Sequence, residues 1–291
     1  MNNLKKALKG LSENFIFQGF LVIIFFLPLI ATLGQYFNSG FINKTNKFLI
    51  LFWPGVKVNY GITVPVWVTM GLMALSYTIG IIYLCRKKVF GKVAIWGIIS
   101  MALPHLLGNI VNHFTGWREL QSTDIMHLTG LVDRMIFSLW QNPLWEEVVF
   151  RGIPLVILIL MKKNLSERAF NLGKWIYIII PSIIFAAYHV PNHGPSRIVD
   201  TVLSGGIFAW LALEYSFFAP LVLHYIVDAM MVVNMGQMKG IPTSEVIWLS
   251  QNHSTLNTVF SISILGLIVS IPIITIANIV KNSRKQKDCA I

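Results

Sequence analysis

The stretch Asn142–Gly152 (NPLWEEVVFRG) places three charged side chains, Glu146, Glu147 and Arg151, at the start of an apolar segment. The chain continues from there as the uninterrupted apolar run LVILILM, residues 155–161. Each charged group inside a bilayer costs at least about 2.5–3.5 kcal/mol on insertion scales, so such groups are retained for structure or function. Whether this segment lies in lipid, and what its charges do there, depends on the rest of the sequence.

The composition indicates a membrane protein, because 55% of the residues are apolar, only 12% are charged, and the mean hydropathy is +0.67. A helix needs roughly 20 apolar residues to cross the hydrocarbon layer. Apolar runs of about that length occur at residues 14–36, 60–84, 93–114, 133–161, 174–190, 198–216, 217–238 and 256–280. We therefore predict an all-α, polytopic membrane protein of about eight transmembrane helices. It forms a single transmembrane domain, residues 1–291, with its core motifs at about 133–238, and the short apolar segment 48–54 is placed at the interface.

The net charge of +11 is a topology signal and not a sign of nucleic-acid binding. If eight helices cross the membrane in alternating directions, the side that holds both termini carries 15 of the 23 Lys and Arg residues. These are Lys5, Lys6, Lys9, Arg86, Lys87, Lys88, Lys92, Lys162, Lys163, Arg168, Lys174, Lys281, Arg284, Lys285 and Lys287. Lys and Arg accumulate on the cytoplasmic side during insertion, so both termini are predicted to be cytoplasmic. We expect membrane lipid as a partner, no nucleic acid, and the bacterial plasma membrane as the location.

The two acidic residues of the opening stretch differ in their local partners. Glu147 and Arg151 are four residues apart, so they face the same side of a helix and can form an ion pair. That pair is either a structural salt bridge or part of a site. Glu146 has no cation three or four residues later, so we expect another helix to supply its partner. Pro154 cannot donate a backbone hydrogen bond, and we expect the helix to bend near the acidic pair.

Two later apolar runs contain further ionisable side chains. His189 lies at the end of the fifth run, where a histidine that hydrogen-bonds a backbone carbonyl is the structural alternative to a catalytic one. His224 and Asp228 lie four residues apart on the seventh run. They either form an Asp–His hydrogen bond that joins neighbouring helices, or Asp228 orients the imidazole within a shared polar cavity.

Together these residues contain what is needed to direct a water molecule at an amide: a general base, a proton partner and donors to an oxyanion. Two histidines and several carboxylates could equally bind Zn²⁺, which would lower the pKa of its bound water. The sequence contains neither H-E-x-x-H nor G-x-S-x-G, so it shows neither the usual zinc-protease helix nor a serine nucleophile motif.

The order of these motifs resembles the CPBP intramembrane proteases, the CAAX prenyl-protease and bacteriocin-processing (Abi) family. The matching motifs are E-E-x-x-x-R at Glu146–Arg151, F-x-x-x-H at Phe185–His189 and H-x-x-x-D/N at His224–Asp228. The resemblance covers about residues 142–230 and implies an eight-helix fold with the site inside the membrane.

The resemblance also implies a role for each motif residue. Glu146 would activate water with help from His189, Glu147 and Arg151 would support the site or the substrate, and His224 and Asp228 would stabilise the oxyanion. The third motif ends here in Asp and not in Asn, and an ionised Asp228 cannot donate to an oxyanion; it would instead orient His224 or bind a metal.

Members of the family are commonly described as metalloproteases, and the resemblance suggests peptide or protein substrates such as bacteriocin leaders, peptide pheromones and prenylated C-termini. Two other functions stay open from the residues alone. One is a non-proteolytic immunity or scaffolding protein of the membrane, and the other is a proton-coupled transporter. Against the transporter, the sequence has no repeated halves with matching broken helices.

Overall fold

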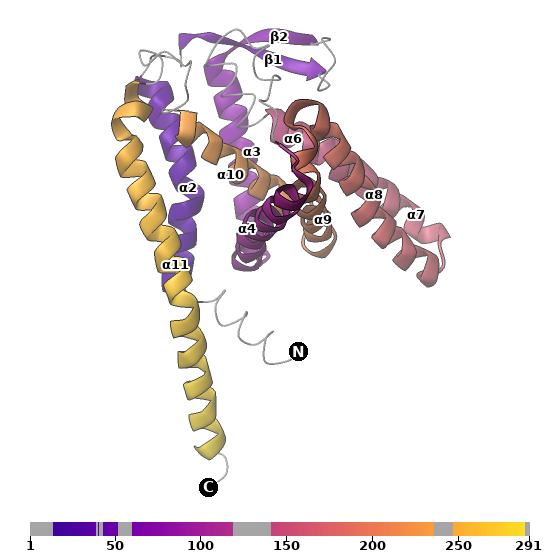
Figure 1. Cartoon of the computed structure of the whole chain (residues 1–291), viewed down its shortest axis with the longest axis vertical. Coiled ribbons are helices and arrows are strands. Elements are labelled where there is room, and N and C mark those ends of the chain that lie inside the picture. The colour runs from indigo at the N-terminus through magenta and orange to yellow at the C-terminus, as the bar shows by residue number, and fades with distance from the viewer. Residues whose placement is uncertain are drawn as a thin grey trace.

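The computed structural model describes residues 14–38, 40, 43–51, 60–118, 141–235 and 247–288, and most of them are helical (Figure 1). The long helices are α2 (Phe15–Asn38), α3 (Val66–Arg86), α4 (Phe90–Thr115), α8 (Glu167–His193), α9 (Ile198–Glu214), α10 (Phe218–Met235) and α11 (Ile247–Asp288). Between α4 and α8 the chain forms α6 (Asn142–Glu147), the π-helical segment η4 (Val148–Gly152), α7 (Ile153–Met161) and the 3₁₀ turn η5 (Lys162–Asn164). A second 3₁₀ turn, η6 (Pro195–Arg197), joins α8 to α9.

Five helices in the described part are long and apolar enough to cross a membrane. They cover Val66–Arg86, Phe90–Thr115, Glu167–Pro191, Pro195–Glu214 and Ser254–Ala277. Large apolar side chains are exposed along several of them, including Leu106, Trp175, Ile183 and Leu265. Contact with lipid removes these side chains from water, as the hydrophobic effect requires. The chain is therefore a helical, multi-pass membrane protein, while the count of eight spans and the orientation of the termini stay predictions.

Within the described residues, the fold departs from an all-α prediction at a two-stranded antiparallel hairpin before α3. Strand β1 (Thr45–Leu51) pairs with β2 (Tyr60–Pro65), and the register places Thr45 opposite Pro65. The helix predicted from residue 60 therefore begins only at Val66. The β-branched sequence Ile-Thr-Val in residues 62–64 favours a strand. Pro65 ends the strand and is the N-cap residue of α3, with a φ of −59°. Figure 1 shows this hairpin at one end of the molecule.

The predicted irregularity near Pro154 takes the form of the π-helical segment η4. The Ile153 amide donates to the carbonyl of Val148, five residues earlier, which marks the wide turn. Tyr177 of α8 is 3% exposed, and its hydroxyl donates to the carbonyl of Arg151 at 3.3 Å. Single π turns inside α-helices are frequent at functional sites. This one lies directly after the two glutamates and contains the arginine.

Helix α10 lies in the interior of the bundle, and glycines on its neighbours allow it to approach closely. Leu221, Val222, Leu223 and Tyr225 are each at most 3% exposed. A Cβ atom on Gly97 of α4 would lie 2.4 Å from Cδ2 of Leu223. Close approach of backbones at small residues is a typical way to pack helices in membranes. This contact positions the residue directly before His224.

We expect Gly97→Ala to destabilise the protein by about 1–3 kcal/mol, since an added methyl group in a full core forces strained side chains or a backbone shift. Thermal unfolding in detergent measures the effect. Gly71→Ala in α3 is the matched control, because nothing lies within 4 Å of the Cβ added there. Equal melting temperatures for both variants would contradict the close approach of α4 to α10.

Candidate active site

Four elements from the second half of the chain bring the predicted site residues into one buried cluster. Glu146 and Glu147 come from α6, Arg151 from η4, His189 from α8, and His224 and Asp228 from α10. The exposed fractions are 2% for Glu146, 0% for Glu147 and 1% for Arg151, so three charged groups are almost fully removed from solvent. Burying charges in this way is costly unless they pair with one another.

The predicted ion pair between Glu147 and Arg151 is confirmed. Arg151 Nη1 donates to Glu147 Oε1 at 2.9 Å. The guanidinium also lies 4.1 Å from the centroid of the Phe185 ring, in a cation–π contact. Phe185, the first residue of the F-x-x-x-H motif, thus covers one face of the guanidinium group.

The same oxygen of Glu147 joins α6 to α10. His224 Nδ1 lies 2.7 Å from Glu147 Oε1, whereas Asp228 Oδ1 is 3.9 Å from His224 Nε2. Of the two alternatives for Asp228 and His224, the direct hydrogen bond is absent at this geometry, because 3.9 Å is too long for one. Glu147 is the carboxylate that orients the His224 ring. Since it accepts from Arg151 as well, Glu147 fixes two side chains with one oxygen.

Glu146 lies between the two histidines, and His189 is close to it as predicted. His189 Nε2 is 3.6 Å from Glu146 Oε1, and His224 Nε2 is 3.3 Å from Glu146 Oε2. Both separations are longer than an ordinary N–H···O hydrogen bond. Catalytic hydrogen bonds are often long without substrate, and they shorten once the reacting groups are in place. The side chain of His189 is 17% exposed, against 2% for Glu146, so it borders the more open side of the cluster.

The backbone contact of His189 assigns its tautomer. Its Nδ1 lies 2.8 Å from the carbonyl oxygen of Phe185, and a carbonyl oxygen only accepts hydrogen bonds. The proton of a neutral His189 ring therefore resides on Nδ1, and the lone pair of Nε2 points toward Glu146. A ring held in this way can accept a proton at Nε2. The backbone hydrogen bond that was the structural alternative for His189 is present. It leaves Nε2 of the ring directed toward Glu146.

Sequence reasoning missed one polar neighbour. Asn142, the first residue of α6, lies near the carboxyl groups of both Glu146 and Asp228. The available signal was its spacing, since Asn142 precedes Glu146 by four residues and so shares its helix face. Its amide can connect the carboxylate of Glu146 with that of Asp228.

A metal site was the alternative chemistry suggested by two histidines and several carboxylates. Among the residues that the structure describes, no group of three or more His, Cys, Asp or Glu side chains is arranged to hold a metal ion. The two Nε2 atoms instead face the two oxygens of Glu146 directly.

A comparison with protein families agrees with the resemblance carried by the three motifs. Residues 129–230 match the model of the Rce1-like family, described as type II CAAX prenyl endopeptidase Rce1-like. All six site residues lie within the matched segment. The predicted resemblance is thereby confirmed. No curated protein and no solved structure gives a significant match to the chain.

The Rce1-like segment supports an intramembrane endopeptidase in general. It covers about a third of the chain: α6, η4, α7, α8, α9 and most of α10 lie in it, while α2, α3, α4 and α11 lie outside.

Proposed function

We propose that the protein is an intramembrane endopeptidase in which Glu146 activates water for attack on a peptide bond. One observation carries the proposal: a buried carboxylate lies between two histidine rings from other helices, with both Nε2 atoms directed at it. The substrates would be membrane-associated peptides or proteins, of which bacteriocin and pheromone precursors and prenylated C-termini are the classes that the family resemblance suggests. The cell membrane is the proposed location.

In the proposed mechanism each group of the cluster has one step. Glu146 takes a proton from water as the oxygen attacks the carbonyl carbon, and His189 Nε2 can accept a hydrogen bond from the same water. The tetrahedral intermediate carries negative charge on the former carbonyl oxygen. As an imidazolium, His224 donates one hydrogen bond to Glu147 through Nδ1 and a second one from Nε2 to this oxyanion. When the C–N bond breaks, Glu146 returns the proton to the leaving amine.

The direct test uses the purified full chain in detergent or liposomes with peptides that carry a membrane-embedded segment. We expect cleavage within the peptide, detected by mass spectrometry, and continued cleavage after dialysis against a tight-binding chelator. Activity that is lost on chelation and restored by Zn²⁺ would replace the carboxylate mechanism with a metal-dependent one. Absence of cleavage in every peptide tested, with full function of Glu146→Gln in cells, would favour a non-enzymatic protein.

A further inference from the structure

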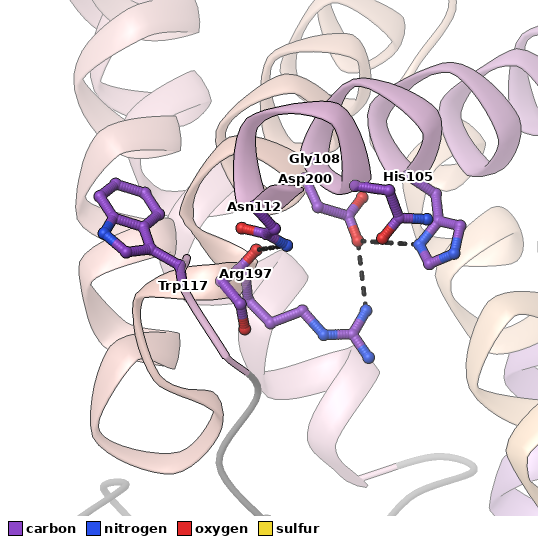
Figure 2. Close-up of a pocket in the computed structure, with 8 residues that line it drawn as sticks. His105, Gly108, Asn112, Trp117, Arg197 and Asp200 are labelled. Carbon is purple, nitrogen blue, oxygen red and sulfur yellow. Dashed lines mark hydrogen bonds and ion pairs between the residues drawn. The ribbon is translucent and has the colours of Figure 1, made fainter. Parts of the chain in front are cut away.

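A polar pocket separate from the catalytic cluster lies beside the turn that follows helix α8 (Figure 2). It encloses about 260 Å³, and it lies between the second half of α4 and the beginning of α9. Its lining residues are His105, Gly108, Asn109, Asn112, Trp117, Ser196, Arg197 and Asp200. None of them belongs to the catalytic cluster. His105 and Asp200 lie within two of the candidate membrane spans. Ionisable side chains in such spans are costly, so they point to a function.

The pocket is connected to the catalytic cluster through the last turn of α8. The rings of His189 and His193 are stacked, with their centroids 5.8 Å apart. Ser196, which lines the pocket, donates its hydroxyl to the carbonyl of His193 at 3.3 Å. Arg197, also in the lining, is close enough to act electrostatically on His189. A ligand in the pocket would therefore lie next to the helix end that holds His189.

The charges in the pocket offset each other. Arg197 Nη1 donates to Asp200 Oδ2 at 3.2 Å, and His105 Nδ1 lies 3.8 Å from the same oxygen (Figure 2). The positive charge of Arg197 and the negative charge of Asp200 neutralise each other, so the pocket needs no counter-ion. The pocket therefore does not favour a strongly anionic or cationic ligand, although donors and acceptors are both present in its wall.

The amide groups of the pocket set the complementary chemistry. Asn112 donates its Nδ2 hydrogen to the carbonyl of Ser196 at 3.0 Å, which fixes the orientation of the amide. Its Oδ1 is buried and has no hydrogen-bond partner within the described part of the chain. A buried acceptor without a partner costs free energy that a donor from a ligand would recover. Asn109, which precedes Asn112 on the same helix, adds an exposed amide to the wall.

We propose that this pocket is a specificity subsite that takes an uncharged, hydrogen-bonding side chain of the peptide substrate, of the Asn, Gln, Ser or Thr type. Its volume lies just below the roughly 300–1,000 Å³ of clefts that hold whole small molecules, so one side chain is the fitting size. The inference rests on the proposed function, because it assigns the pocket to the substrate that the catalytic cluster hydrolyses.

The test fills the pocket without changing the catalytic residues. Asn109→Trp places a large ring in the wall, and Leu106→Trp is the matched control on an exposed, apolar position of the same helix. Both proteins are assayed with membrane-anchored peptides in which each position near the cleavage site is varied in turn. The wild type should prefer Asn, Gln, Ser or Thr at one position. Asn109→Trp should lower kcat/KM for those peptides about tenfold or more through KM, because a site built to hydrogen-bond a group discriminates strongly.

The control outcomes separate the subsite from the enzyme as a whole. Leu106→Trp should keep the wild-type preference, and peptides with Ala at the selected position should be cleaved equally by all three proteins. Asn109→Leu, which removes the amide with little change in size, should weaken the preference if the tryptophan variant folds poorly. An unchanged preference in both Asn109 variants, or a preference for charged side chains, would overturn the subsite.

Failure of the proposed function would give a different result from failure of the subsite. Peptide binding is therefore also measured with Glu146→Gln, which cannot use its side chain as a base. If the wild type cleaves no peptide, the endopeptidase proposal fails. The other case is that the wild type cleaves peptides, while the double variant Glu146→Gln/Asn109→Trp binds polar and Ala peptides as tightly as Glu146→Gln does. Only the subsite proposal then fails.

Discussion

Glu146→Gln is expected to lower kcat by about 10²–10⁴-fold, the range that a positioned general base contributes. The substitution keeps the size of the side chain and its acceptor oxygen, and removes the ability to take a proton from water. Its neighbours at 3.3 and 3.6 Å, His224 and His189, stay available as hydrogen-bond partners. The rate is measured as cleavage of a membrane-anchored peptide by the purified variant.

Two measurements show that the loss is chemical. The melting temperature of Glu146→Gln in detergent should stay close to that of the wild type, because glutamine has the same size and its oxygen can still accept hydrogen bonds from the neighbouring histidines. Glu167→Gln alters an exposed carboxylate in the first turn of α8 and should keep full activity. Cleavage by Glu146→Gln at the wild-type rate would exclude Glu146 as the base.

The sequence predicts short-range features of the site well. The spacing of four residues between Glu147 and Arg151 is enough to predict their ion pair, since the side chains of such a pair lie on one helix face. The absence of a local cation for Glu146 likewise predicts that its neighbours come from other helices. His189 and His224 lie there, and they are 43 and 78 residues away along the chain.

Features that depend on how helices cross were not predictable from spacing. The i,i+4 pattern assigns Asp228 to His224, yet Glu147 takes that role because α6 and α10 meet where its oxygen reaches Nδ1. The hairpin was missed for a different reason. Residues 60–65 continue the apolar run of α3 without a break in composition, and a short apolar run does not distinguish strand from helix.

Arg151→Met is expected to lower the free energy of unfolding by about 3–5 kcal/mol, the usual cost of removing one partner from a buried ion pair. The arginine is 1% exposed, and without it the carboxylate of Glu147, which is 0% exposed, keeps only His224 as a charged partner within the described part of the chain. The cation–π contact with Phe185 is lost as well. Thermal unfolding of the detergent-solubilised protein measures the change, and Arg168→Met, at an exposed position of α8, provides the control.

The double variant Glu147→Gln/Arg151→Met separates the structural function of the pair from its function in the site. Removing both charges should restore much of the stability, because no uncompensated charge remains at these two positions. Activity should stay low, since the neutral amide that replaces the Glu147 carboxylate holds the His224 ring less firmly. Stability and activity that recover together would show that the pair only supports the fold. Recovery of stability alone would place Glu147 among the residues that orient the catalytic histidine, and this is the result that the shared oxygen at 2.7 Å from His224 Nδ1 predicts.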